Sequence, residues 1–158
     1  MNKELIRHAI LSQLENQHAL AVKSANEARD LATHEQSQPE TQYDTVGLEA
    51  SYLAHGQSQR VFDLDAMIQR YRNMTLRNFT SDDEIALSAY VELAYPDDTT
   101  KAFFIGPCAG GLELLIEEQK VHLITPDAPL ARCMMGAYDG DEFELPGSNQ
   151  TVEVVRIS

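Results

Sequence analysis

The chain has 158 residues, 43% hydrophobic and 23% charged, an ordinary globular mixture that excludes a wholly disordered chain. Its formal net charge of −13 excludes broad charge-driven binding to nucleic acid, because such binding needs a cationic surface. Residues 76–158 carry five Lys or Arg against fifteen Asp or Glu, so most of the acidic excess lies there, which suits a basic protein partner or good solubility alone.

The N-terminal segment MNKELIRHAILSQLE contains charges and no unbroken apolar run. It is therefore predicted to be neither a signal peptide nor a membrane span, and we expect a cytoplasmic location. Cys108 and Cys133 have no CxxC or zinc-type spacing. Both lie among apolar residues, so we expect reduced, buried thiols.

Two segments of the first half show apolar and small residues at alternating steps of three and four, the pattern of a coiled-coil seam. The first consists of Leu11, Leu14, His18, Ala21, Ala25, Ala28 and Ala32. The second consists of Ala54, Gln57, Val61, Leu64, Ile68 and Tyr71. Each seam needs a partner, and the nearest partner for each helix is the other.

We therefore predict that residues 1–75 form an antiparallel coiled-coil hairpin with its tip at about residues 33–45. Asp44 or Thr45 is a candidate N-cap of the second helix. Thirty helical residues span roughly 45 Å, so we expect most of the hairpin to stand in solvent. The alternative is a structural dimer, in which two chains pair through the same seam.

The predicted tip, THEQSQPETQYDT, carries three carboxylates: Glu35, Glu40 and Asp44. A tip of this composition either connects two helices passively or presents those carboxylates at a distance.

Residues 76–158 are predicted to form a small, predominantly antiparallel β domain with one short helix, so the chain is of the α+β class. The expected strands are the runs IALSAYVELAY, TKAFFIG, KVHLIT, DEFEL and TVEVVRIS, and the turn signals between them include PDDTT and GPCAGG. The short helix is expected over APLARCMMG, with Pro129 in its first turn and Gly136 at its end.

No motif indicates a self-contained active site. GPCAGG lacks the Lys-Ser/Thr of a phosphate-binding P-loop, so we expect a hairpin or an irregular turn there. The histidines do not form a metal-binding pattern, and no nucleophile elbow is present. We therefore expect no catalytic activity of its own and no stably bound cofactor.

The segment ITPDAPLARCMMGAYDGDEFEL resembles the C-terminal domain of the GreA/GreB family of bacterial transcript-cleavage factors. That family's pattern runs from a strand through Asp or Asn, Ser, Pro, an aliphatic residue, Ala or Gly and Arg into a short helix. The matching residues here are Asp127, Pro129, Leu130, Ala131, Arg132 and Gly136, followed by Gly140 and Asp141. Ala128 stands where the family prefers Ser. The order of a hairpin followed by a sheet also fits, so the resemblance extends over nearly the whole chain.

The resemblance implies an FKBP-like domain that docks on bacterial RNA polymerase through Asp127, Ala128 and Pro129. It also implies that the coiled coil enters the secondary channel of the polymerase. There the tip acids would help to hold a Mg²⁺ ion of the polymerase, so that the enzyme hydrolyses its own backtracked transcript. The protein would thus be an accessory factor rather than an enzyme, and we expect a monomer.

The tip differs from the family pattern Asp-x-x-Glu-Asn-x-x-Tyr. Alignment on Tyr43 places Gln36 and Pro39 at the two acidic positions, and a one-residue gap brings Glu40 onto the second. Two effects therefore stay open: stimulation of cleavage, or competition with factors that stimulate it. The coil is net negative, so only weak contact with transcript RNA is expected. The FKBP-like domain type also leaves a prolyl isomerase as an alternative, although the chain has no Trp to form the floor of such a pocket.

Overall fold

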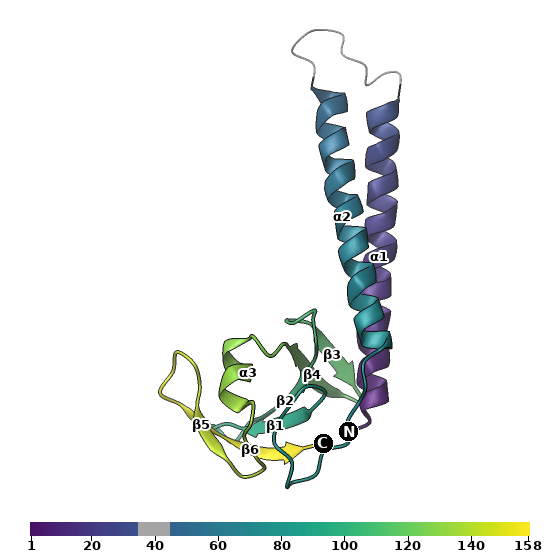
Figure 1. Cartoon of the computed structure of the whole chain (residues 1–158). Coiled ribbons are helices and arrows are strands. Elements are labelled where there is room, and N and C mark those ends of the chain that lie inside the picture. Colours follow the sequence, from purple (N-terminus) through teal and green to yellow (C-terminus); the bar gives the residue numbers. More distant parts are fainter. Residues whose placement is uncertain (35–44) are drawn as a thin grey trace. The chain divides into compact units, whose positions relative to one another are not determined.

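The structure, a computed structural model, describes residues 1–34 and 45–158. Its elements in chain order are α1 (Lys3–Thr33), α2 (Val46–Arg72), β1 (Tyr90–Ala94), β2 (Thr100–Ile105), β3 (Glu113–Ile116), β4 (Gln119–Ile124), α3 (Pro129–Met134), β5 (Glu142–Glu144) and β6 (Thr151–Ile157) (Figure 1). The chain divides into two compact units. The helical unit is Leu11–Gln69, and the sheet unit combines Met1–Ile10 with Arg70–Ser158.

The two long helices run antiparallel and side by side, which confirms the predicted helical hairpin (Figure 1). The residues of the helical unit that are buried lie on the predicted seams or extend them by one step: Leu14, Ala21, Ala28, Ala50, Leu64 and Ile68. The other predicted seam positions of this unit are half-buried. The sequence periodicity thus identifies the face that each helix buries.

Helix α2 begins at the residue after Thr45, one of the two predicted N-cap residues. The carbonyl of Thr45 accepts a hydrogen bond from the Glu49 N–H at 2.8 Å, and its hydroxyl donates to the Glu49 carboxylate at 2.8 Å. Glu49 is also the acidic residue of the first turn, where a negative charge suits the positive end of the helix dipole. Asp44, the other predicted cap, lies outside the described residues.

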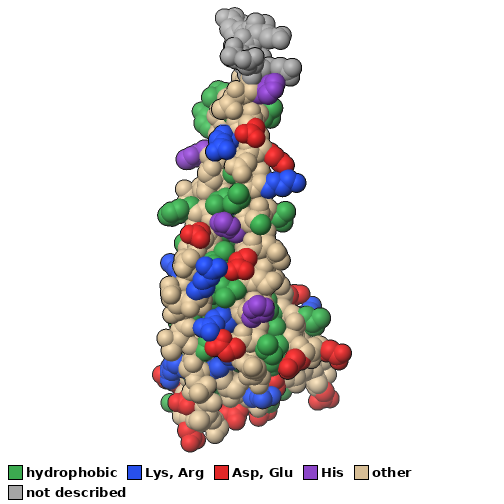
Figure 2. Space-filling view, turned by 90° about the vertical axis from the view of Figure 1, so that its right-hand side faces the viewer, with side chains coloured by type: hydrophobic (Ala, Val, Ile, Leu, Met, Phe, Trp, Pro, Cys, Tyr) green, Lys and Arg blue, Asp and Glu red, His purple; other side chains and the backbone are tan. Residues whose placement is uncertain are grey.

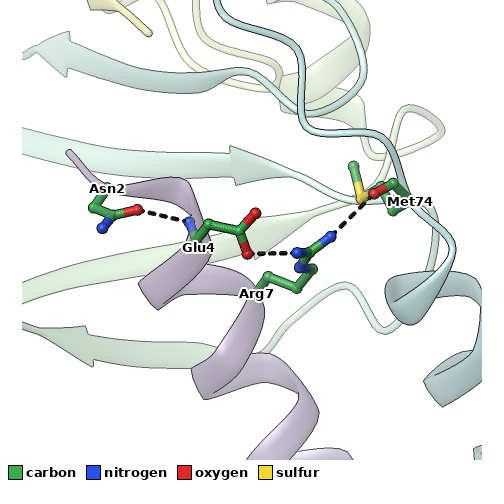
Figure 3. Close-up of polar contacts among 4 residues, drawn as sticks. All are labelled: Asn2, Glu4, Arg7 and Met74. Atoms are coloured by element: carbon green, nitrogen blue, oxygen red, sulfur yellow. Dashed lines mark hydrogen bonds and ion pairs between the residues drawn. The ribbon is translucent and has the colours of Figure 1, made fainter.

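The start of α1 is tied to the chain that follows α2 (Figure 3). The Asn2 side-chain oxygen accepts a hydrogen bond from the Glu4 N–H at 3.0 Å. The Glu4 carboxylate pairs with the Arg7 guanidinium at 2.5 Å, and Arg7 also donates to the carbonyl of Met74 at 3.3 Å. One arginine thus joins the first turns of α1 to the exit from α2, both within the sheet unit.

The sheet unit contains a six-stranded sheet in the order β3-β4-β2-β1-β6-β5. Four of its five strand pairs are antiparallel, and β2 pairs with β4 in parallel. The α+β class and the predominantly antiparallel sheet with one short helix are therefore confirmed, with one parallel pair that the sequence pattern did not predict.

Strand β3 was not among the predicted strands. It pairs with β4 through a tight turn at Glu117 and Glu118, whose φ angles are 48° and 69°. Two consecutive positive φ angles are typical of the type I′ hairpin, which usually has Asn or Gly at these positions. Because two glutamates occupy the turn, the usual sequence signal for this hairpin is missing.

One core cluster of the sheet unit lies on one face of the sheet, where Val91, Leu93, Phe103, Ile105, Val152 and Val154 gather with Met134 of α3. Neither Cys108 nor Cys133 forms a disulfide, and Cys108 is half-buried. The expectation that Cys133 is buried is wrong, because Cys133 is exposed. The inward positions of the short helix are Ala131 and Met134, and an intervening residue on so short a helix points away from the core.

Candidate functional site

The three acids predicted to act at the tip, Glu35, Glu40 and Asp44, lie outside the described residues. The described structure fixes only the helix ends that flank them. Helix α1 ends at Thr33, whose hydroxyl donates to the Arg29 carbonyl at 3.0 Å, and α2 begins at Val46.

The predicted docking residues lie at the junction between β4 and α3. After Ile124 the chain makes a turn in which the Ala128 N–H donates to the Thr125 carbonyl at 2.9 Å. Ala128 has an extended backbone (φ −62°, ψ 140°), and Pro129 is the first residue of α3. Proline suits this position because its ring fixes φ near the helical value and the first helical N–H has no partner within the helix. Asp127, Ala128 and Pro129 thus form one short, conformationally restricted segment, which we call the docking junction.

The docking junction is exposed on one side and anchored on the other. Asp127 and Pro129 are exposed, and Ala128 is half-buried. Behind them Ala131 and Met134 are both 0% exposed. Helix α3 is therefore held against the sheet core while the side chains of Asp127 and Pro129 face solvent.

The far end of α3 is clamped by backbone hydrogen bonds. Gly136 has a φ of 82°, and its N–H donates to the Ile85 carbonyl at 2.9 Å. The Ile85 N–H donates in turn to the Ala137 carbonyl at 2.8 Å. The predicted helix end at Gly136 agrees with this left-handed conformation, which glycine adopts without strain.

The charge of the sheet unit is predominantly acidic on the face drawn in Figure 2, where red side chains gather near its lower edge. Within residues 1–34 and 45–158, no group of three or more His, Cys, Asp or Glu side chains is placed to hold a metal ion. None of the helices described here has the combined length and apolarity that crossing a bilayer requires.

The sheet unit has a surface hollow of about 320 Å³, which the sequence did not predict. It is lined by Tyr95, Lys101, Phe103, Leu112, Glu113, His122 and Leu130, among others. These residues come from β1, β2, β3, β4 and α3 or the segments beside them. No short motif contains them, because strand pairing alone brings them together. The sequence offered one signal for this hollow. Side chains alternate between the two faces of β4, so His122 lies on the same face as Ile124.

Comparisons with known proteins gave matches among solved structures alone. No protein-family model matches the chain, and no curated protein matches it either.

The chain is similar to the crystal structure of GreA factor homolog 1 (Gfh1) of Thermus thermophilus, with 19% identity over 94% of each chain and a TM-score of 0.38. It is similar to Gfh1 of Thermus aquaticus, with 20% identity over 92% of each chain and a TM-score of 0.36. It also matches the elongation factor GreA/GreB from Nitrosomonas europaea, with 14% identity, 70% of this chain and 92% of that chain covered, and a TM-score of 0.33.

Proposed function

We propose that this chain is an accessory factor of bacterial RNA polymerase that acts during transcription elongation. In this proposal the sheet unit docks on the polymerase and the helical hairpin enters its secondary channel, where the tip modulates the active site. The observation that carries the proposal is the resemblance of residues 124–145 to the GreA/GreB pattern, which falls on an exposed and well-anchored junction.

The docking junction has the properties that a protein-binding segment needs. Asp127 and Pro129 present a charge and a rigid ring to solvent. The turn bond to Thr125 and the buried side chain of Met134 hold the backbone in one conformation, so little conformational entropy is lost on binding. An exposed carboxylate at the junction suits a basic partner surface, in keeping with the acidic excess of residues 76–158.

The proposed work of the tip rests on the chemistry of its residue types. Glu35, Glu40 and Asp44 would supply hard oxygen ligands to a Mg²⁺ ion that belongs to the polymerase. The ion and the scissile transcript are both held by the polymerase, so this chain needs neither a metal site nor a catalytic group of its own. The proposal also places the protein in the bacterial cytoplasm, where the polymerase acts.

The first experiment tests docking. Purified full-length chain is immobilised, and binding of bacterial RNA polymerase is measured by biolayer interferometry for the wild type, Asp127→Ala and Asp139→Ala. Asp139 is a matched control because it is an exposed aspartate of the same unit outside the junction. We expect at least tenfold weaker binding for Asp127→Ala and wild-type binding for Asp139→Ala. Absence of binding by the wild-type chain would refute the proposal.

The second experiment tests the tip. RNA cleavage is followed in a backtracked elongation complex with wild type, Glu40→Ala and the control Glu27→Ala, which removes an exposed acid from α1. Faster cleavage with the wild type identifies a cleavage factor, and slower cleavage in the presence of a known cleavage factor identifies a competitor. In either case the effect should weaken in Glu40→Ala and persist in Glu27→Ala, and equal effects in all three proteins would remove Glu40 from the mechanism.

A further inference from the structure

The hollow on the sheet unit combines an apolar floor with a single cationic side chain. Phe103 and the His122 ring lie on neighbouring strands with their centroids 5.5 Å apart and an angle of 33° between the ring planes. Leu112 and Leu130 add aliphatic surface to the lining. At about 320 Å³, the hollow has the size and predominantly apolar lining of a small-molecule site.

Lys101 supplies the charge of this hollow. Its ammonium nitrogen lies 4.4 Å from the centroid of the Tyr95 ring, and both residues line the hollow. A cation over a ring face gains electrostatic attraction, but a ring does not neutralise it. The hydrogen bonds from Thr99 lower the pKa of the Asp97 carboxyl, and the Lys101 ammonium adds a smaller effect in the same direction.

The other charges of the lining are already paired. The Glu113 carboxylate accepts a hydrogen bond from the Lys120 ammonium at 2.9 Å, and its second oxygen lies 3.5 Å from the His122 ring nitrogen Nδ1. Lys120 and its hydrogen bond lower the pKa of Glu113, which keeps this carboxylate ionised. The charges of Glu113 and Lys120 thus offset one another. Among the lysines that line the two hollows, Lys101 is the one that can pair with a ligand.

A second hollow of about 540 Å³ adjoins the first and shares Lys101 and His122 with it. A ligand that places its apolar body in the first hollow can therefore extend its polar end past Lys101 into the second. One available cation suits a monoanion better than a dianion such as phosphate, because a second negative charge would face Glu113 and Glu118.

We propose that this hollow binds a small aromatic carboxylate, with its ring against the His122 ring and the aliphatic lining and its carboxylate paired with Lys101. The site lies beside the docking junction, since Leu130 directly follows Pro129 in the chain. The inference does not depend on the polymerase proposal, because it rests on the lining of the hollow alone.

The test uses 2-naphthoate as the probe and the full chain labelled with nitrogen-15. Amide shifts are followed by NMR during titration, which suits a protein of 17.6 kDa. We expect saturable shifts centred on Tyr95, Phe103 and His122. The neutral analogue 2-naphthamide should bind at least tenfold more weakly, because it cannot pair with the Lys101 ammonium.

Two variants test whether the Lys101 ammonium is the charge that binds the probe. Lys101→Met keeps the length of the exposed side chain and removes its charge, and we expect at least tenfold weaker binding of 2-naphthoate. Arg156→Met removes an exposed cation on β6 outside the hollow and should bind as the wild type does. The inference is overturned by an absence of saturable shifts at millimolar probe, by shifts centred elsewhere, or by equal loss of affinity in both variants.

Discussion

The hydroxyl of Tyr71 donates a hydrogen bond to the backbone carbonyl of Cys108 at 2.7 Å. Tyr71 lies in the last turn of α2 and Cys108 in the loop after β2, and the two residues are 37 positions apart in the chain. The Tyr71 hydroxyl also lies against Gly106, the first residue of the sequence GPCAGG, where there is no room for a Cβ atom. This loop therefore packs against the end of α2.

Gly106→Ala should destabilise the sheet unit by about 1–3 kcal/mol, the usual range for overpacking a filled core. A Cβ atom at this position would overlap the Tyr71 hydroxyl and lie 2.7 Å from a methyl group of Leu123. Urea unfolding measures the change. Gly56→Ala is the control, because a Cβ there meets nothing within 4 Å and alanine favours the helix, so its stability should rise by about 0.5–1 kcal/mol. A neutral Gly106→Ala variant would contradict the close approach.

Tyr71→Phe should destabilise the same unit by about 1 kcal/mol, since it keeps the ring and leaves the Cys108 carbonyl without this donor. Tyr71 is 0% exposed, so water cannot readily replace the hydroxyl. Urea unfolding gives the value, and Tyr138→Phe serves as the control because Tyr138 is 45% exposed. Equal stabilities of Tyr71→Phe and wild type would show that the hydrogen bond contributes nothing net.

Lys3 should make stability depend on pH in the alkaline range. Its ammonium donates to the Arg77 carbonyl and lies 4.7 Å from the Phe79 ring centroid. Burial and, to a smaller extent, the Arg77 guanidinium lower the pKa of Lys3 from 10.5 to about 8. Between these two pH values the unfolded chain binds the proton and the folded chain does not. The free energy of unfolding contributed by Lys3 therefore rises with pH across this window.

The measurement for Lys3 compares urea unfolding of wild type and Lys3→Met from pH 7 to pH 10. Subtracting the variant removes the contributions of all other titrating groups. We expect wild type to gain stability relative to Lys3→Met as the pH rises above about 8. A constant difference would mean that the pKa of Lys3 is not lowered in the folded chain.

Leu14→Ala should destabilise the helical hairpin by about 2–5 kcal/mol, the usual loss for a buried leucine. Leu14 is 1% exposed on the α1 seam, whereas Leu20 on the same helix is 67% exposed. Leu20→Ala should therefore change stability by less than about 0.5 kcal/mol. Thermal unfolding followed by far-ultraviolet circular dichroism compares the two variants, and similar losses in both would contradict the assignment of the seam.

The helical part of this fold could be predicted because its signal is local. Apolar and small residues at alternating steps of three and four decide which face of a helix is covered, and the buried residues from Leu14 to Ile68 lie on those steps or extend them. The helix ends could also be predicted, since Thr45, Pro129 and Gly136 act through the backbone within one turn.

The candidate site could be predicted in part. The order of residues from Asp127 to Gly136 predicted the short helix and its two ends, but the anchoring of that helix by Met134 and Ile85 depends on contacts across the sheet unit. The tip acids Glu35, Glu40 and Asp44 stay a prediction, because they lie outside the described residues.

The sequence by itself determined the two helices, their inward faces and the α+β class, whereas docking through Asp127, Ala128 and Pro129 stays a prediction. The tertiary structure alone decided three other features: the pairing of β2 with β4, the approach of Gly106 to Tyr71, and the hollow beside Lys101. The physical reason is the range of the interactions. Periodicity and capping act within a few residues of the same segment, whereas parallel pairing and close packing join residues whose proximity no local pattern encodes.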